Sequence, residues 1–104
     1  MRTLHYTFPA WREPARRAHV GVVGSGDLEI LLEPGDSTDE ARVRVRTSVQ
    51  GFDEIWQATL ERFFARTPVS GSWELNDSGA TPAVVTLRLQ QAAGAAGAIG
   101  STTE

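Results

Sequence analysis

The alternation of apolar and polar residues along the chain predicts several short strands. Residues 3–8 place Leu4, Tyr6 and Phe8 on one face, and Pro9 ends this strand. Residues 28–33 and 41–49 show the same period of two, which is typical of strands with one buried face. Further strands are expected at residues 18–23, 70–76 and 83–90.

The period changes to about 3.6 between residues 53 and 66, which predicts a helix. Its apolar stripe consists of Trp56, Leu60, Phe63 and Phe64. Acidic residues stand near the start and arginines near the end, as the helix dipole favours, and Pro68 follows as a stop signal. We expect the stripe, Trp56 and Phe63 above all, to pack on a sheet as core.

These elements predict an α+β fold with a mostly antiparallel sheet of about six strands. One main helix, at about residues 52–66, covers one face, so the fold is not a helical bundle. Residues 1–92 are expected to form a single domain. Residues 93–104 are of low complexity, and Gly94, Gly97 and Gly100 weaken any helix there, so we expect a disordered tail.

Two apolar segments flank the tetrapeptide Gly24-Ser25-Gly26-Asp27, which predicts a β-hairpin with Ser25 at its tip. Glycine accepts positive φ at little steric cost, and Asp27 can bond the nearby backbone. An exposed serine between two glycines suits a residue that another enzyme must reach. It suits an ordinary turn equally well, and the spacing alone leaves both interpretations open.

Composition narrows the class of protein. The chain has 104 residues, a net charge of −3, no cysteine and no apolar run long enough to cross a bilayer. The start of the sequence has no continuous apolar segment of the secretory type, so a cytoplasmic protein is expected. The acidic balance argues against a primary role in binding nucleic acid.

Catalysis by Ser25 finds little support. A nucleophile elbow needs glycine two residues before and after the serine, but Val23 and Asp27 stand there. His19 lies six residues away along a predicted strand, about 20 Å if the chain is extended. No spacing of acidic residues or histidines resembles a metal site, and no dinucleotide or phosphate-loop glycine pattern occurs.

Arginine supplies all ten basic residues, and two groups of them raise a binding hypothesis. Arg12, Arg16 and Arg17 lie in a predicted loop, where they are either solvated or available to a phosphate or a partner protein. Arg42, Arg44 and Arg46 share one face of a predicted strand. That stripe keeps open a different class of function, a small non-catalytic binding or adaptor module.

The segment VGVVGSGDLEILLEP at residues 20–34 resembles the signature of the acyl-carrier subunit (delta, or C) of bacterial malonate decarboxylase. The resemblance continues through RVRVRTSVQGFDEIWQATLERFF and ATPAVVTLRLQQA, mainly in pattern and length. The gamma subunit of citrate lyase is a related carrier with a similar Ser-Gly-Asp, and it remains the alternative. The longer pattern favours the malonate enzyme.

The resemblance implies a non-catalytic carrier with no metal. Ser25 would hold phosphoribosyl-dephospho-coenzyme A through a phosphodiester, with Gly24, Gly26 and Asp27 as supporting residues of the motif. The thiol of that group would carry acetyl and malonyl units. Implied partners are the acyl-transferase and decarboxylase subunits of the complex and the enzyme that attaches the prosthetic group. Arg12, Arg16 and Arg17 would be phosphate or partner contacts.

Overall fold

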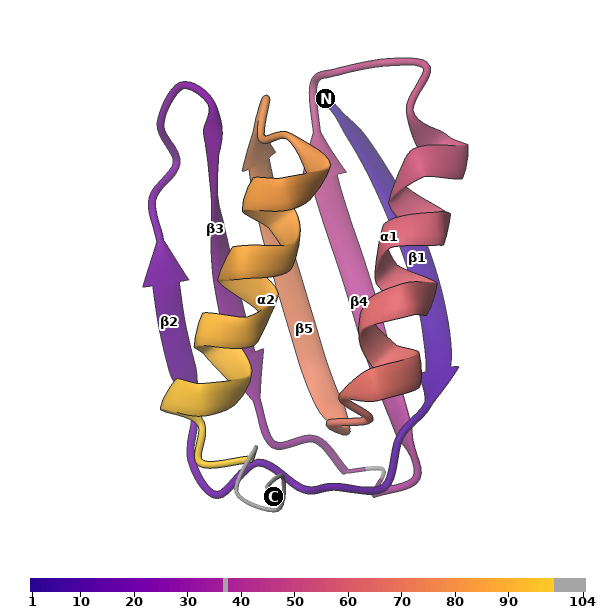
Figure 1. The fold of residues 1–104 in the computed structure, drawn as a ribbon, viewed down its shortest axis with the longest axis vertical. Helices are drawn as coiled ribbons and strands as arrows, with labels where there is room; N and C mark the ends of the chain where they lie inside the picture. Colours follow the sequence, from indigo (N-terminus) through magenta and orange to yellow (C-terminus); the bar gives the residue numbers. More distant parts are fainter. Residues whose placement is uncertain (37, 99–104) are drawn as a thin grey trace.

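The computed structural model describes residues 1–36 and 38–98 and contains one sheet and two helices (Figure 1). The strands are β1 (Arg2–Pro9), β2 (Ala18–Gly21), β3 (Asp27–Glu33), β4 (Glu40–Thr47) and β5 (Gly71–Ser78). The helices are α1 (Asp53–Arg66) and α2 (Pro82–Ala95).

The strand order in the sheet is β1-β4-β5-β3-β2. Among the described strands, β4 and β5 pair in parallel and all other neighbours pair antiparallel. Helix α1 makes the crossover between the two parallel strands, as such a connection requires. β5 therefore joins two antiparallel pairs, β1–β4 on one side and β2–β3 on the other.

Both helices cover the same face of the sheet, side by side (Figure 1). The core between these layers is formed by one side of each strand, including Ile30, Val45 and Leu75, each fully buried. Trp73 stands at its centre, where the rings of Phe63 and Phe64 pack edge-on against it. The predicted stripe of α1 is confirmed, because Trp56, Leu60, Phe63 and Phe64 are all buried.

The α+β class and the mostly antiparallel sheet are as predicted, but the sheet has five strands and a second helix replaces the sixth. Residues 83–90 were expected to alternate as a strand, and they form most of α2 instead. Thr81 caps this helix by accepting a hydrogen bond from the amide of Val84, and Pro82 occupies the first turn. Leu89 is fully buried while Leu87 is 49% exposed, which is a helical and not a strand-like pattern.

Helix α2 also continues beyond the expected domain end at residue 92. It ends at Ala95, and Ala93, Ala96 and Ala98 pack into the core. The Arg16 guanidinium donates a hydrogen bond of 2.8 Å to the carbonyl of Ala95, which satisfies one of the free carbonyls at the helix end. The disordered tail was predicted at residues 93–104. The part at residues 93–98 is ordered, as the end of α2 and the buried alanines show, and residues 99–104 lie outside the described residues.

Within residues 1–36 and 38–98, neither helix combines the length and the apolar character that a bilayer span demands.

Candidate functional site

Ser25 lies at the tip of the β2–β3 hairpin, at the same end of the molecule as the N-terminal turns of both helices (Figure 1). The amide of Asp27 donates a hydrogen bond of 2.9 Å to the carbonyl of Gly24, which closes a four-residue turn. The third residue of the turn, Gly26, has a φ of 78°, whereas the second, Ser25, has a negative φ, as does every described non-glycine residue. A positive φ at the third position alone is the pattern of a type II turn. The Ser25 side chain is exposed, as the sequence predicted.

The first hairpin strand ends earlier than predicted, at Gly21 and not at Val23. Gly21 has a φ of 75°, and a Cβ atom there would lie 2.0 Å from the carbonyl oxygen of Leu28. The chain therefore leaves the ladder at a position that only glycine fits. As a result, Val22 and Val23 turn outward beside Ser25, with 58% and 65% of their surface exposed.

Asp27 connects the hairpin tip to α2 through a two-point ion pair. The Nε and Nη2 atoms of Arg88 donate to its two carboxylate oxygens at 2.9 and 2.6 Å. The hydrogen bonds from Arg88 and, next, from the Leu28 amide lower the pKa of the Asp27 carboxyl below its ordinary value of 3.8. The sequence did not predict Arg88 as a partner of Asp27, because nothing in the local pattern relates two residues that are 61 positions apart.

A second anchor holds the opposite side of the tip. The amide of Gly26 donates a hydrogen bond of 2.8 Å to the carbonyl of Ser78, at the end of β5. The turn is thus tied both to the sheet and to a helix, while the Ser25 hydroxyl forms no hydrogen bond within the part of the chain that the structure describes. This arrangement presents a free hydroxyl on a fixed backbone.

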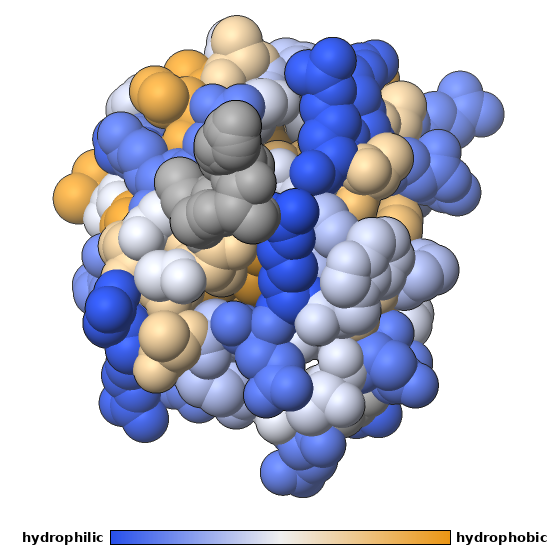
Figure 2. Space-filling view, turned by 60° about the horizontal axis from the view of Figure 1, so that its bottom comes forward, coloured by the Kyte–Doolittle hydropathy of each residue, from blue (hydrophilic) through white to orange (hydrophobic). Residues whose placement is uncertain are grey.

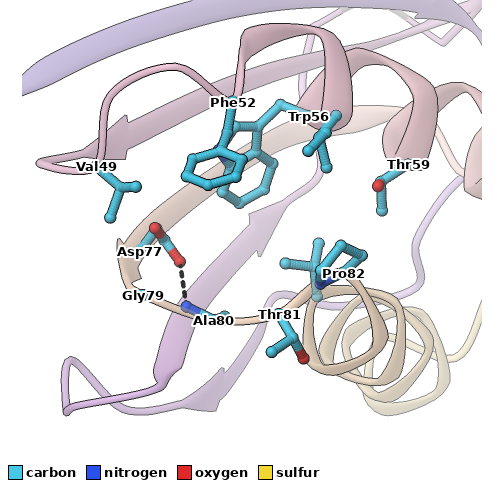
Figure 3. A pocket seen from close by; sticks show the side chains of 11 residues that line it. Val49, Phe52, Trp56, Thr59, Asp77, Gly79, Ala80, Thr81 and Pro82 are labelled. Atoms are coloured by element: carbon cyan, nitrogen blue, oxygen red, sulfur yellow. Dashed lines mark hydrogen bonds between the residues drawn. The ribbon is translucent and has the colours of Figure 1, made fainter.

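Two hollows open at this end of the molecule. One is an open depression whose lining includes Met1, Val23 and Arg46. The other is a pocket of about 270 Å³ between the first turns of α1 and α2, and Figure 3 shows the Trp56 and Phe52 rings on one side and Pro82 on the other. The two hollows share the lining residues Val49, Asp77 and Gly79, so they lie next to each other.

The family model described as malonate decarboxylase delta subunit (MdcD) matches residues 15–96, which include the hairpin, α1, β5 and α2. This chain belongs to the malonate decarboxylase delta subunit family. The match covers both Ser25 and Arg88, so it includes the tip and its anchor on α2.

Individual members of the delta subunit family agree with this assignment. The chain is 50% identical over 92 residues to the malonate decarboxylase acyl carrier protein of Pseudomonas fluorescens (strain SBW25), covering 88% of this chain and 92% of that protein. It is 50% identical over 96 residues to the protein of the same name from Burkholderia cepacia, covering 89% and 88%. A chain in the crystal structure of a Pseudomonas malonate decarboxylase hetero-tetramer in complex with malonate superposes with a TM-score of 0.81. That chain is 48% identical, and the match covers 88% of this chain and 95% of that one.

In this delta subunit, Arg12, Arg16 and Arg17 do not lie beside Ser25. Their loop crosses the opposite end of the molecule, at the ends of β1 and α2 (Figure 1). Figure 2 brings that end forward and shows mainly hydrophilic side chains across it, with hydrophobic ones gathered at one side. Arg16 binds the carbonyl of Ala95, and Arg17 lies 3.7 Å from the Glu33 carboxylate. The sequence-based grouping of these arginines with a phosphate on Ser25 therefore has no support in the geometry.

The arginine stripe on β4 lies on the uncovered face of the sheet. Arg42 pairs with Glu40, and Arg44 pairs with Glu74. Arg46 is exposed and has no ion-pair partner among the described residues, and it lines the depression beside the hairpin tip. The stripe is therefore largely neutralised, which weakens the adaptor-module interpretation, and its one free cation is close to the Ser25 end.

Neither histidine supplies a base to Ser25. His19 lies on β2 and its Nε2 atom is 2.8 Å from a carboxylate oxygen of Glu29, while His5 lies on β1 at the far edge of the sheet. The residues described contain no group of three or more potential metal ligands. The chemistry that this tip offers is an accessible hydroxyl as an acceptor of a group delivered from outside.

Proposed function

We propose that this chain is the acyl carrier subunit of malonate decarboxylase, and that Ser25 carries phosphoribosyl-dephospho-coenzyme A through a phosphodiester. The observation that carries the proposal is the exposed Ser25 hydroxyl on a turn anchored to both β5 and α2. Membership of the delta subunit family and the identity to malonate decarboxylase acyl carrier proteins support it. When bound, the group supplies a thiol that holds acetyl and malonyl units as thioesters.

The residues around Ser25 suit a phosphodiester. Gly24 and Gly26 leave both sides of the hydroxyl open to a transferring enzyme. A free carboxylate two residues away would repel the phosphate, but the Asp27 charge is offset by the guanidinium of Arg88. In the transfer, the Ser25 oxygen forms the new bond to phosphorus, its proton goes to solvent, and a phosphate-class leaving group departs from the activated donor.

The chain itself presents the Ser25 hydroxyl for modification and then tethers the attached group. The Asp27–Arg88 pair and the Gly26–Ser78 hydrogen bond fix the orientation of the turn relative to the rest of the domain. A group attached there moves only within its tether, which raises its effective concentration near any active site against which this end docks. The acid, base and oxyanion groups come from the partners, so this subunit is non-catalytic.

The partners that we propose are the acyl-transferase and decarboxylase subunits, together with the enzyme that attaches the prosthetic group, all in the cytoplasm. A neighbour of the same fold within a malonate decarboxylase hetero-tetramer supports assembly with other subunits. The same neighbour and the family model favour the malonate enzyme over a gamma-type carrier of citrate lyase.

The test is an intact mass measurement after co-expression with the attaching enzyme. We expect a mass increase equal to one prosthetic group in the wild type and in Ser72→Ala, an exposed serine in the middle of the sheet. Ser25→Ala should show the unmodified mass. An unmodified wild-type chain beside an attaching enzyme that modifies another carrier would refute the proposal.

A further inference from the structure

The pocket between the helices has the size and lining of a site for a small molecule fragment. Its walls are mainly apolar, from Phe52, Ile55, Trp56 and Val85, with Thr59 and Asp77 as polar groups. Such a mixture is typical of ligand sites, but about 270 Å³ is slightly below the roughly 300–1,000 Å³ of pockets for drug-sized ligands. The pocket therefore fits the end of a cofactor arm and not a whole cofactor.

The pocket also lies within the region that a group tethered at Ser25 explores. It shares the wall residues Val49, Asp77 and Gly79 with the open depression, which reaches Val23, two residues from Ser25. The hairpin tip and the first turns of α1 and α2 share one end of the molecule (Figure 1). Tethering raises the local concentration of the arm, so a shallow apolar site binds the tethered group better than the same group free in solution.

Asp77 places a negative charge at the wall of this pocket. Asp77 is 8% exposed, and one of its carboxylate oxygens accepts a hydrogen bond of 2.9 Å from the Thr47 hydroxyl. The other accepts a hydrogen bond of 3.0 Å from the Ala80 amide (Figure 3). No cation pairs with it within the described residues. An anionic group that entered would lose its hydration and face a like charge, whereas a neutral group would not.

We propose that this pocket receives the end of the prosthetic arm when that end is uncharged, as the free thiol or the acetyl thioester, and excludes the malonyl thioester. The inference rests on the proposed function of Ser25. The neutral forms are then sheltered against the carrier between reactions, and the malonyl form stays exposed for its partner enzyme. The carrier itself thereby distinguishes the two acyl states by charge.

The absence of cysteine makes a direct test possible, because the arm then holds the sole thiol of the modified protein. We would measure the rate at which this thiol reacts with the neutral reagent 4,4′-dithiodipyridine, beside free pantetheine. Burial of two methylene groups predicts that the tethered thiol reacts roughly tenfold more slowly. Thr59→Leu, which fills the pocket, should restore the rate of free pantetheine, and the isosteric Thr59→Val should not.

The acyl forms are compared through the cleavage of their thioesters by hydroxylamine. The acetyl form should be cleaved more slowly than S-acetylpantetheine, and the malonyl form at the rate of S-malonylpantetheine. If Thr59→Leu fails to fold, Val49→Phe at the half-buried rim obstructs the same pocket.

Three results would overturn the inference. The first is a wild-type thiol as reactive as free pantetheine, and the second is equal protection of the acetyl and malonyl thioesters. The third is protection that arises only after partner subunits are added, because the protecting surface would then belong to a partner and not to this pocket. A chain that gains no prosthetic group refutes the proposed function as well, and the mass measurement identifies that case separately.

Discussion

Arg88 on α2 and Asp27 at the start of β3 form a two-point ion pair across 61 residues, with nitrogen–oxygen distances of 2.9 and 2.6 Å. Both side chains are partly buried, at 26% and 20% exposure. The planar guanidinium matches both carboxylate oxygens, so the pair fixes orientation as well as distance. The helix that packs on the sheet is thus joined directly to the turn that presents Ser25.

The ion pair predicts a pH-dependent contribution to stability. Arg88 lowers the pKa of Asp27 below 3.8, so the stabilisation is present above that ordinary value and is lost as the pH falls through the lower folded pKa. Asp27→Asn should lower the urea midpoint near neutral pH, and its difference from the wild type should close on acidification. The exposed Asp36→Asn serves as control. A difference that is unchanged in acid would contradict an ionic origin.

The two glycines at the ends of the hairpin loop should respond differently to alanine. Gly26→Ala has open space for a Cβ atom and costs only the left-handed backbone conformation, about 1–2 kcal/mol. Gly21→Ala should be more destabilising, because its Cβ atom would lie 2.0 Å from the Leu28 carbonyl oxygen. Urea unfolding measures both. Equal losses of stability would show that the loop relaxes freely at Gly21.

Helix α2 predicts a contrast between two leucines that the strand interpretation placed on the same face. Leu89→Ala should cost about 2–5 kcal/mol, because Leu89 is fully buried. Leu87→Ala should stay within about 0.5 kcal/mol, because Leu87 is half exposed. Thermal or urea unfolding measures the loss of stability in each variant, and both variants carry the same leucine-to-alanine substitution. Similar losses would favour the strand pattern.

Arg46 is the cation that we expect to attract the anionic donor of the prosthetic group. It is unpaired within the described chain and lines the depression that includes Val23. Arg46→Glu should slow the modification of Ser25 several-fold, mainly through slower encounter, and the effect should shrink at high salt. A time course of the intact mass measures it.

Two arginines serve as matched controls for this effect. Arg42 lies at the other end of the same strand and is paired with Glu40, and Arg17 lies at the opposite end of the molecule. Arg42→Glu and Arg17→Glu should leave the rate within about twofold of the wild type, since the Debye length is about 8 Å at physiological ionic strength. Equal slowing by all three variants would indicate a dependence on net charge alone.

The sequence predicted those elements whose period and boundary signals agree. Alternation, glycine and proline correctly predicted the strand at residues 3–8, which is observed as β1, the hairpin with Ser25 exposed, and helix α1. Residues 83–90 were wrongly predicted as a strand because Val84, Val85 and Thr86 favour strands and the following leucines alternate. The correct signal was present in Thr81-Pro82, a capping residue followed by a proline suited to the first helical turn.

The surroundings of Ser25 were less accessible to sequence reasoning. Spacing identified the turn, but its two anchors, Arg88 and the Ser78 carbonyl, come from elements more than 50 residues away. The sequence-based prediction grouped the basic loop at Arg12, Arg16 and Arg17 with Ser25 because this loop precedes the hairpin in the chain. Strand β2 and the residues after it run from one end of the molecule to the other (Figure 1). Proximity in sequence therefore did not mean proximity to Ser25 in space.

The position of β5 between the two antiparallel pairs has a consequence for the order of events during synthesis. Ser25 emerges from the ribosome before β5, through which β3 contacts β4 and β1, and Arg88 follows later still. Because these long-range contacts form only when most of the chain is available, a nascent hairpin has a turn without anchors. An attaching enzyme that reads the folded turn would therefore modify finished chains and pass over truncated ones.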